Sequence, residues 1–289
     1  MLFRAAYNLP VTLGMERGVF ARHGLDIDLA YTRGSAMTTE SLLSGEREVG
    51  VLSADDVVYE VERRAADLFI FMGLNAGILA LMARPGISTA RDLLGGRLGV
   101  DDPASGFALV AHRMLRGMGL SPADYQTVAC GGHEPRAQAL REGKIDAALV
   151  TPPFSFALAA QGAPTLARAR DYLPRYLGSC AVTTRRWASA NGPRLRAYAR
   201  AYRESLAWAL EPANRTAAVA HLARTFNLEA PLANRTFDAL ADPDDGLFRD
   251  ARIDSAGIDT VLDLRIEAGL LGPQRPDPSR YYDGRYLGS

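Results

Sequence analysis

Two hydroxyl side chains occupy matching places in a repeated stretch, where they could hydrogen-bond a small polar ligand. The segment Ala137–Phe154 repeats, without a gap, a pattern found earlier in the chain, and Thr151 in it corresponds to Ser53. Each copy reads as an amphipathic helix ended by a glycine, then a short apolar strand, then the hydroxyl residue. Because ligands bind beyond the carboxyl ends of strands in open α/β sheets, the repeat predicts two similar lobes whose strand ends face a shared cleft.

Other candidate ligand-binding residues share a position at a strand end or at the start of the next helix. Free backbone N–H groups and the helix macrodipole supply partial positive charge at such places without a buried cation. This chemistry suits an anion or a polar head group. The candidates beside Ser53 are Asn8, Pro10, Ser35, Asp55 and Asn75, and those beside Thr151 are Ser105, Gly106, Phe107, Gly132, His133 and Phe154.

Several of these residues have a purely structural alternative. Ser35 and Ser105 could cap the helices that they open, and one side chain can do both. Asp55 could pair with a cationic ligand, or it could simply stabilise the start of its helix. Phe107 and Phe154 could stack on an aromatic ligand or pack in the core. The sequence leaves these alternatives open.

His133 is the candidate with acid–base chemistry. It follows two glycines on an expected loop that faces the cleft. It could bind an anion or transfer a proton, since histidine titrates near neutral pH. The alternative is a solvent-exposed loop histidine. If the protein is an enzyme, His133 and Asp55 are the catalytic candidates.

The elements that must position these residues alternate between strand and helix up to residue 184. The apolar runs Val49–Leu52 and Ala147–Val150 lack polar alternation, which is typical of strands buried on both faces of a parallel sheet. Leu25–Tyr31 alternates apolar and polar residues and predicts a half-buried or edge strand. Further strands are expected near residues 2–8, 68–74, 97–100, 125–130 and 178–184.

Beyond residue 184 the periodicity is helical. Helices are expected at 193–210, 213–226, 232–240 and 255–270, followed by an extended tail. The chain is therefore expected to be an α/β protein with right-handed crossovers and a helical C-terminal extension.

Composition excludes several classes of partner. The 33 basic and 33 acidic residues give zero formal net charge, so nothing attracts the chain as a whole to nucleic acid or to a membrane surface. No apolar run approaches the roughly 18–20 residues that span a bilayer. Cys130 and Cys180 are the two cysteines, and both read as small buried hydrophobes. Without a C-x-x-C, H-E-x-x-H or EF-hand pattern we expect no metal site, and no cofactor is implied.

The start of the chain bears on location. Met1 is followed almost at once by a predicted strand, and no positive region followed by an apolar one is visible, so no signal peptide is expected in this sequence. If Met1 is the native start, the protein is expected to be cytoplasmic. If a leader was removed, it is expected to be periplasmic or lipid-anchored outside the cytoplasm.

Four motifs resemble those of a known family. Leu13–Ile27 reads LGMERGVFARHGLDI, Leu42–Val51 reads LLSGEREVGV, Arg84–Val100 reads RPGISTARDLLGGRLGV, and Ser279–Asp283 reads SRYYD. These stretches are similar to the solute-binding proteins of nitrate, sulfonate and taurine ABC importers, a group related to thiamine-pyrimidine synthases. The resemblance covers nearly the whole chain.

The resemblance implies a two-lobed periplasmic-binding-protein fold of type 2. Each lobe would hold a mostly parallel sheet flanked by helices, and the lobes would close over a ligand as hinged bodies. Lobe one would comprise residues 1–83 and 181–289, and lobe two residues 84–180. The hinge would lie near residues 83–84 and 178–181.

Three functions then compete. The first is binding of a small organic anion, such as a sulfonate, a carboxylate or a heteroaromatic acid, for delivery to an ABC permease. The second is a cytoplasmic enzyme on the same scaffold, a decarboxylase or pyrimidine-synthase-like lyase or transferase that acts on a small organic acid. The third is a ligand-sensing module for a signalling partner. A buried inorganic anion is disfavoured, because the candidates include no cationic residue.

Overall fold

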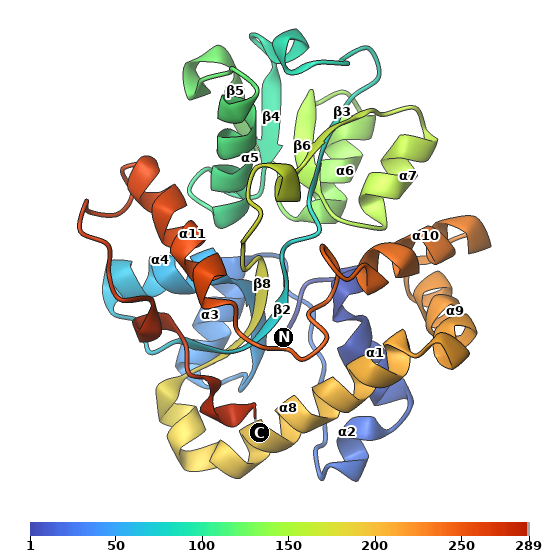
Figure 1. The fold of residues 1–289 in the computed structure, drawn as a ribbon, viewed down its shortest axis with the longest axis vertical. Helices are drawn as coiled ribbons and strands as arrows, with labels where there is room; N and C mark the ends of the chain where they lie inside the picture. Colours follow the sequence, from blue (N-terminus) through green and yellow to red (C-terminus); the bar gives the residue numbers. More distant parts are fainter. Residues whose placement is uncertain (288–289) are drawn as a thin grey trace.

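The computed structural model describes residues 1–287, which fold around two β-sheets. The three-stranded sheet has the order β1 (Gly50–Ser53), β8 (Ser179–Thr183), β2 (Phe69–Asn75). The five-stranded sheet has the order β5 (Gln126–Ala129), β4 (Arg97–Val100), β6 (Ala147–Val150), β3 (Ala80–Ala83), β7 (Thr165–Arg168). Figure 1 shows the five-stranded sheet at the top and the three-stranded sheet below it, with the chain crossing between them twice. The expected α/β fold is confirmed.

The strands that cross between the sheets run against their neighbours. β4 is parallel to β5 and β6, but β3 is antiparallel to β6 and β7. Likewise β8 is antiparallel to both β1 and β2. The reason is geometric, since β3 and β8 begin between the sheets, where β1, β2, β4 and β6 end. In place of the mostly parallel sheets expected, the five-stranded sheet is therefore mixed and the three-stranded sheet is antiparallel. Among the described strands, parallel pairing is confined to β4, β5 and β6.

Helices cover both sheets. The helices around the three-stranded sheet include α1 (Leu9–Glu16), α2 (Val19–Arg22), α3 (Ser35–Ser44) and α4 (Ala54–Arg64). Those on the five-stranded sheet are α5 (Gly106–Gly117), α6 (His133–Arg141) and α7 (Phe154–Ala160). The helical C-terminal part consists of α8 (Arg185–Leu210), α9 (Arg215–Phe226), α10 (Ala230–Ala241) and α11 (Ser255–Glu267). No helix among residues 1–287 is both long and apolar enough to cross a membrane.

The N-terminal segment departs from the expected strands. Residues 2–8 and 25–31 share a single parallel bridge, between Leu2 and Tyr31. The Asn8 side chain donates from Nδ2 to the Phe3 carbonyl oxygen at 2.8 Å, which folds the chain back on itself. A short 3-10 turn at Ala6–Asn8 and then α1 follow. The strand that alternating apolar and polar residues predicted at residues 25–31 is therefore wrong.

The chain passes from one sheet to the other between β2 and β3 and returns between β7 and β8, and the two-lobe division that the resemblance implies stays a proposal. One boundary shifts, because β3 pairs with β6 and β7 and so lies in the five-stranded sheet. The first crossing therefore precedes Ala80 rather than following Ala83. The C-terminal tail returns to the other sheet, where the Asp283 backbone N–H donates to the Ile70 carbonyl at 2.9 Å.

Candidate functional site

The candidate site is the junction, meaning the region where the strand ends of the two sheets and the helices that follow them meet. α4 begins directly after β1 and α5 shortly after β4. Their starts touch, because a Cβ built on Gly106 would lie 2.3 Å from Cβ of Asp55. α6 and α7 likewise follow β5 and β6. The junction thus collects helix N-termini from both sheets, as the repeat predicted.

The predicted site residues lie at these strand ends and helix starts. Seven of them and Pro10 are buried: Asn8, Ser53, Asp55, Asn75, Gly106, His133 and Thr151. The others are half-buried: Ser35, Ser105, Phe107, Gly132 and Phe154. Ser53 pairs with Ser179 across the three-stranded sheet, and Asn75 pairs with Ser179 from the other side. This row of polar residues closes the sheet at the junction.

Several buried polar atoms at the junction have no hydrogen-bond partner within residues 1–287. They are Asn8 Oδ1, Asn75 Nδ2, Arg136 Nε, Thr151 Oγ1 and Tyr176 OH. Leaving such an atom buried and unpaired costs about 1–3 kcal/mol. Buried polar atoms of this kind normally bond to a ligand or to ordered water.

Arg136 is the main site residue that sequence reasoning missed. It lies in the first turns of α6, it is 1 % exposed, and its guanidinium donates to Asp101 Oδ1 at 3.1 Å and to His133 Nδ1 at 2.9 Å. The reason given against a buried inorganic anion, that the candidates include no cationic residue, therefore no longer holds. Only strand ends and first helical residues were considered, and Arg136 sits one turn further along. Its spacing of three residues from His133 is the signal that could have found it.

His133 is fixed in one protonation state by this contact. Arginine has no acceptor, so Nδ1 must accept the Arg136 hydrogen bond and the ring must carry its proton on Nε2. Burial, and then the Arg136 charge, hold the pKa of His133 well below its usual value. His133 is 7 % exposed and begins α6, so the exposed-loop alternative is wrong. It can offer a ligand an Nε2–H donor.

Asp55 is already paired inside the protein. Arg265 of α11 donates from Nε to Asp55 Oδ1 at 2.7 Å and from Nη2 to Oδ2, and both side chains are buried. The same Nη2 reaches the Ala104 carbonyl oxygen at 3.2 Å. Asp55 therefore joins α4, α11 and the loop before α5, and both carboxylate oxygens are occupied.

Asp56, the next residue, was not among the candidates. Its Oδ2 accepts from the Ser53 backbone N–H at 3.0 Å and from Ser35 Oγ at 2.8 Å. Ser53 Oγ in turn accepts from the Asp56 backbone N–H at 3.0 Å, which completes a capping box. Burial, followed by the Asp55 charge, raises the pKa of Asp56 to about 7. The S-x-x-D spacing was visible in the sequence as a capping signal.

Ser35 and Ser105, the two serines that could cap a helix, differ in whether they do so. Ser35 does not cap its own helix, because Gly34 is the N-cap and the Ser35 hydroxyl donates to Asp56. Ser105 is a true N-cap, since its Oγ accepts from the Ala108 backbone N–H at 3.2 Å. Its hydroxyl also donates to Asp101 Oδ1 at 2.6 Å.

The two aromatic candidates, Phe107 and Phe154, differ in what their rings contact. The Phe107 ring lies 5.6 Å from the His133 ring, so it belongs to the wall of the junction. The Phe154 ring packs edge-on against Phe226 with ring centres 6.5 Å apart. Phe154 thus contacts α9.

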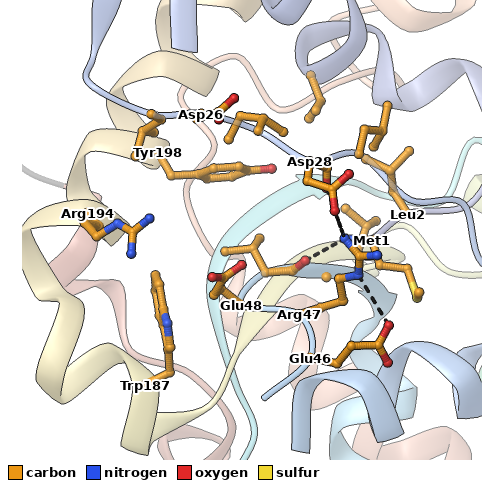
Figure 2. A pocket seen from close by; sticks show the side chains of 17 residues that line it. Met1, Leu2, Asp26, Asp28, Glu46, Arg47, Glu48, Trp187, Arg194 and Tyr198 are labelled. Carbon is orange, nitrogen blue, oxygen red and sulfur yellow. Dashed lines mark hydrogen bonds and ion pairs between the residues drawn. The ribbon is translucent and has the colours of Figure 1, made fainter. Parts of the chain in front are cut away.

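A separate groove lies beside Met1, away from the junction. It encloses about 290 Å³, and none of the predicted ligand-binding residues lines it. Figure 2 shows Trp187 and Tyr198 on one side and Arg47 with its acidic neighbours on the other. Arg47 pairs with Asp28 at 2.6 Å, and the Met1 amino group donates to the Val49 carbonyl oxygen at 2.7 Å. Burial lowers the pKa of that amino group to about 6.

No metal centre is visible within residues 1–287, where no group of three or more metal-binding side chains comes together. Cys130 and Cys180 are both free, and burial raises the pKa of each thiol.

Comparison with known proteins identifies the family. A family model described as NMT1/THI5 like matches residues 5–215. The chain belongs to the NMT1/THI5-like family. This confirms the resemblance found in the sequence. No curated protein matches the chain.

Solved structures support the same fold. The alkanesulfonate-binding protein SsuA from Xanthomonas axonopodis pv. citri, bound to MOPS, is 20% identical with a TM-score of 0.81, covering 98% of this chain and 96% of that one. The periplasmic nitrate-binding protein NrtA from Synechocystis PCC 6803 is 11% identical with a TM-score of 0.85, covering 99% and 85%. The periplasmic aliphatic sulphonate binding protein SsuA from Escherichia coli is 20% identical with a TM-score of 0.73, covering 97% and 89%. Likeness at this level of identity establishes the fold and leaves the ligand open.

Proposed function

We propose that this protein binds a small organic anion at the junction and delivers it to the permease of an ABC importer. The observation that carries the proposal is Arg136, a buried guanidinium with an unpartnered Nε–H at a helix N-terminus. The structural neighbours named for sulfonate and nitrate binding support it. Their periplasmic location supports an extracytoplasmic place for this protein as well.

The anion would be held mainly by hydrogen bonds. Asp101 already balances the Arg136 charge, so the guanidinium contributes N–H donors more than net charge. His133 Nε2–H and the Thr151 hydroxyl add donors from the same wall, together with the backbone N–H groups that open α6. A sulfonate or carboxylate offers enough acceptors for such a set.

The enzymatic alternative gains no specific support from the site. Both oxygens of Asp55 are occupied by Arg265, and Nδ1 of His133 is occupied by Arg136. Neither is placed as a free base. We therefore favour binding.

The test is a ligand panel of alkyl sulfonates, alkyl and aryl carboxylates, heteroaromatic acids and nitrate. A ligand present at about 100 times its dissociation constant should stabilise the fold by about 2.7 kcal/mol, which a melting curve resolves. Proton NMR of the same mixtures over hours should show unchanged ligand signals. Signals that convert to a product would instead establish an enzyme.

A variant pair locates the binding site. We expect Arg136→Gln to abolish the ligand-induced rise in melting temperature, because loss of a buried charged donor costs about 2–5 kcal/mol of affinity. The matched control is Arg141→Gln on the exposed face of the same helix, which should bind normally. Equal affinity in both variants would place the ligand elsewhere.

A further inference from the structure

The long helix α8 concentrates positive charge at one place in the molecule. Between Arg185 and Leu210 it holds a single acidic residue, Glu204, and six arginines: Arg185, Arg186, Arg194, Arg196, Arg200 and Arg203. Because the chain as a whole has no formal net charge, the rest of it is acidic by the same amount. The molecule is therefore electrically polarised, with a basic region at α8.

The positive charges of α8 are not neutralised within the described part of the chain. None of its arginines lies within ion-pair distance of a carboxylate among residues 1–287. Glu204 is already taken, since it contacts Arg22 at 2.9 Å and His23 at 2.7 Å. Arginines elsewhere are often paired, as Arg64 is with Glu40 at 2.6 Å. The unpaired charges of α8 are left to attract opposite charge from outside the molecule.

Three guanidinium groups in the middle of α8 are bonded to nothing within residues 1–287. Arg194, Arg196 and Arg200 take part in neither an ion pair nor a side-chain hydrogen bond there, and Figure 2 shows Arg194 without a partner beside Trp187. Arg194 and Arg200 are exposed and Arg196 is half-buried. The side of the helix that packs on the core includes Leu195, Ala199 and Tyr202. The outward side of α8 therefore presents N–H donors that the fold does not use.

The position of α8 suits contact with a flat surface. Figure 1 shows the helix at the opposite end of the molecule from the five-stranded sheet, with the junction between the two. A planar surface could therefore touch the outward side of α8 without covering the junction.

The character of this surface favours an anionic bilayer over a protein partner. Protein interfaces centre on well-packed apolar or aromatic groups. The exposed large hydrophobic residues of the described chain all lie outside α8, and they are Tyr31, Met37, Leu94 and Leu270. Lipid phosphates instead form a diffuse array of negative charge, which arginines bind through paired N–H donors.

We propose that α8 docks this protein on a membrane surface rich in anionic phospholipids, with Arg194, Arg196 and Arg200 bonding to headgroup phosphates. The inference is independent of the ligand that the junction binds. Such docking would hold the protein beside the membrane in which a permease lies, and it would leave the junction accessible.

The test is binding to phospholipid vesicles, measured by co-sedimentation. We expect binding to vesicles that mix phosphatidylglycerol with phosphatidylcholine, and none to phosphatidylcholine alone. Added salt should weaken the binding, because the Debye length falls from about 10 Å at 0.1 M to about 3 Å at 1 M. Both tryptophans of the chain, Trp187 and Trp208, lie on α8, so their fluorescence should change on binding.

A triple variant tests the assignment to α8. Arg194→Gln combined with Arg196→Gln and Arg200→Gln should lower vesicle affinity by about a hundredfold, since each basic residue near an anionic surface contributes about fivefold. The melting temperature should stay the same, because these side chains make no bonds within the fold. The matched control changes three exposed arginines elsewhere that likewise have no ion pair among residues 1–287, namely Arg33→Gln, Arg91→Gln and Arg168→Gln.

The control carries the same net charge as the α8 variant, so it separates a local surface from overall charge. A loss of affinity confined to the α8 variant would establish the inference. Equal losses in the two triple variants, equal binding to both kinds of vesicle, or no binding to anionic vesicles would overturn it. Binding to duplex DNA with none to vesicles would also overturn it, and would assign α8 to a nucleic acid. Each of these outcomes leaves anion binding at the junction untouched.

Discussion

Asp55 and Asp56 are neighbours at the start of α4, yet their side chains contact different elements of the fold. Successive residues in a helix point about 100° apart, so the start of α4 sends them in different directions. Asp55 meets Arg265, and both of its oxygens are bonded. Asp56 faces the end of the three-stranded sheet, where Ser35 and the Ser53 backbone bond one oxygen and leave the other free.

The two carboxyl groups differ in how completely their hydrogen bonds are satisfied. A buried ion pair with every bond satisfied holds elements together, here α4, α11 and the loop before α5. Burial raises the pKa of both carboxyl groups, but only half-buried Asp56 keeps an oxygen free to accept a bond from a ligand. The same residue type thus has both oxygens bonded at position 55 and one oxygen unbonded at position 56 among residues 1–287.

The largest expected effect comes from breaking the satisfied pair. We expect Arg265→Met to lower the free energy of unfolding by about 3–5 kcal/mol, because it leaves the Asp55 charge buried and unpaired. Urea denaturation measures the loss. The double variant Asp55→Asn with Arg265→Met should recover part of it, since the orphaned charge is then removed.

An exposed ion pair that also involves α11 provides the control. Arg113 of α5 pairs with Glu267 of α11, and both side chains are well exposed. Arg113→Met should cost no more than about 1 kcal/mol. If Arg265→Met were no more destabilising than Arg113→Met, the ion pair between Asp55 and Arg265 would not be formed in solution. Asp55 would then have unbonded oxygens, as Asp56 does.

The second prediction concerns the pH dependence of stability and tests Asp56, whose carboxyl has an oxygen without a hydrogen bond among residues 1–287. The folded-state pKa of Asp56 is about 7 and its ordinary value is 3.8, so between these values the folded protein binds more protons than the unfolded chain. Its contribution to stability therefore falls as the pH rises from about 4 to about 7, by up to about 1.4 kcal/mol per pH unit. The stability of Asp56→Asn should lack this pH-dependent contribution. Subtracting the stability–pH profile of the variant from that of the wild type isolates it.

Two other groups give the opposite sign and make the test sharper. The pKa of His133 is lowered, so its contribution to stability falls as the pH drops below 6.5. Asp92 also has a lowered pKa, because backbone N–H groups bond its carboxylate. The Asp92 contribution to stability is present above its ordinary value of 3.8 and is lost only below it, so the difference profile of Asp92→Asn should be flat between pH 4 and 7, where that of Asp56→Asn slopes. Matching slopes would mean that Asp56 is not buried as described.

The sequence predicted the parts of the site that depend on local signals. Strand ends followed by hydroxyl residues were readable at Ser53 and Thr151, and the capping role of Ser105 followed from its place before a helix. The fold class and the helical C-terminal part were likewise readable from periodicity. Each of these depends on residues close together in the chain.

The parts that were missed depend on contacts between distant residues. Arg265 lies 210 positions from Asp55, and no local pattern announces that pair. Arg136 is likewise paired with a distant residue, Asp101, which lies 35 positions earlier in the chain. The antiparallel course of β8 was also invisible, because the direction of a returning strand depends on where the chain crosses between the sheets.

The smallest expected effect on stability belongs to Thr151, and it tests the position of the junction itself. Its hydroxyl is buried and has no partner among residues 1–287, so Thr151→Val removes an unsatisfied group at nearly constant volume. The free energy of unfolding should be unchanged or slightly raised. Affinity for the anionic ligand should fall by about tenfold, because a donor that acts only on the ligand is lost. A variant that lost stability together with affinity would show that Thr151 supports the fold, and one that kept its affinity would place the anion away from the end of β6.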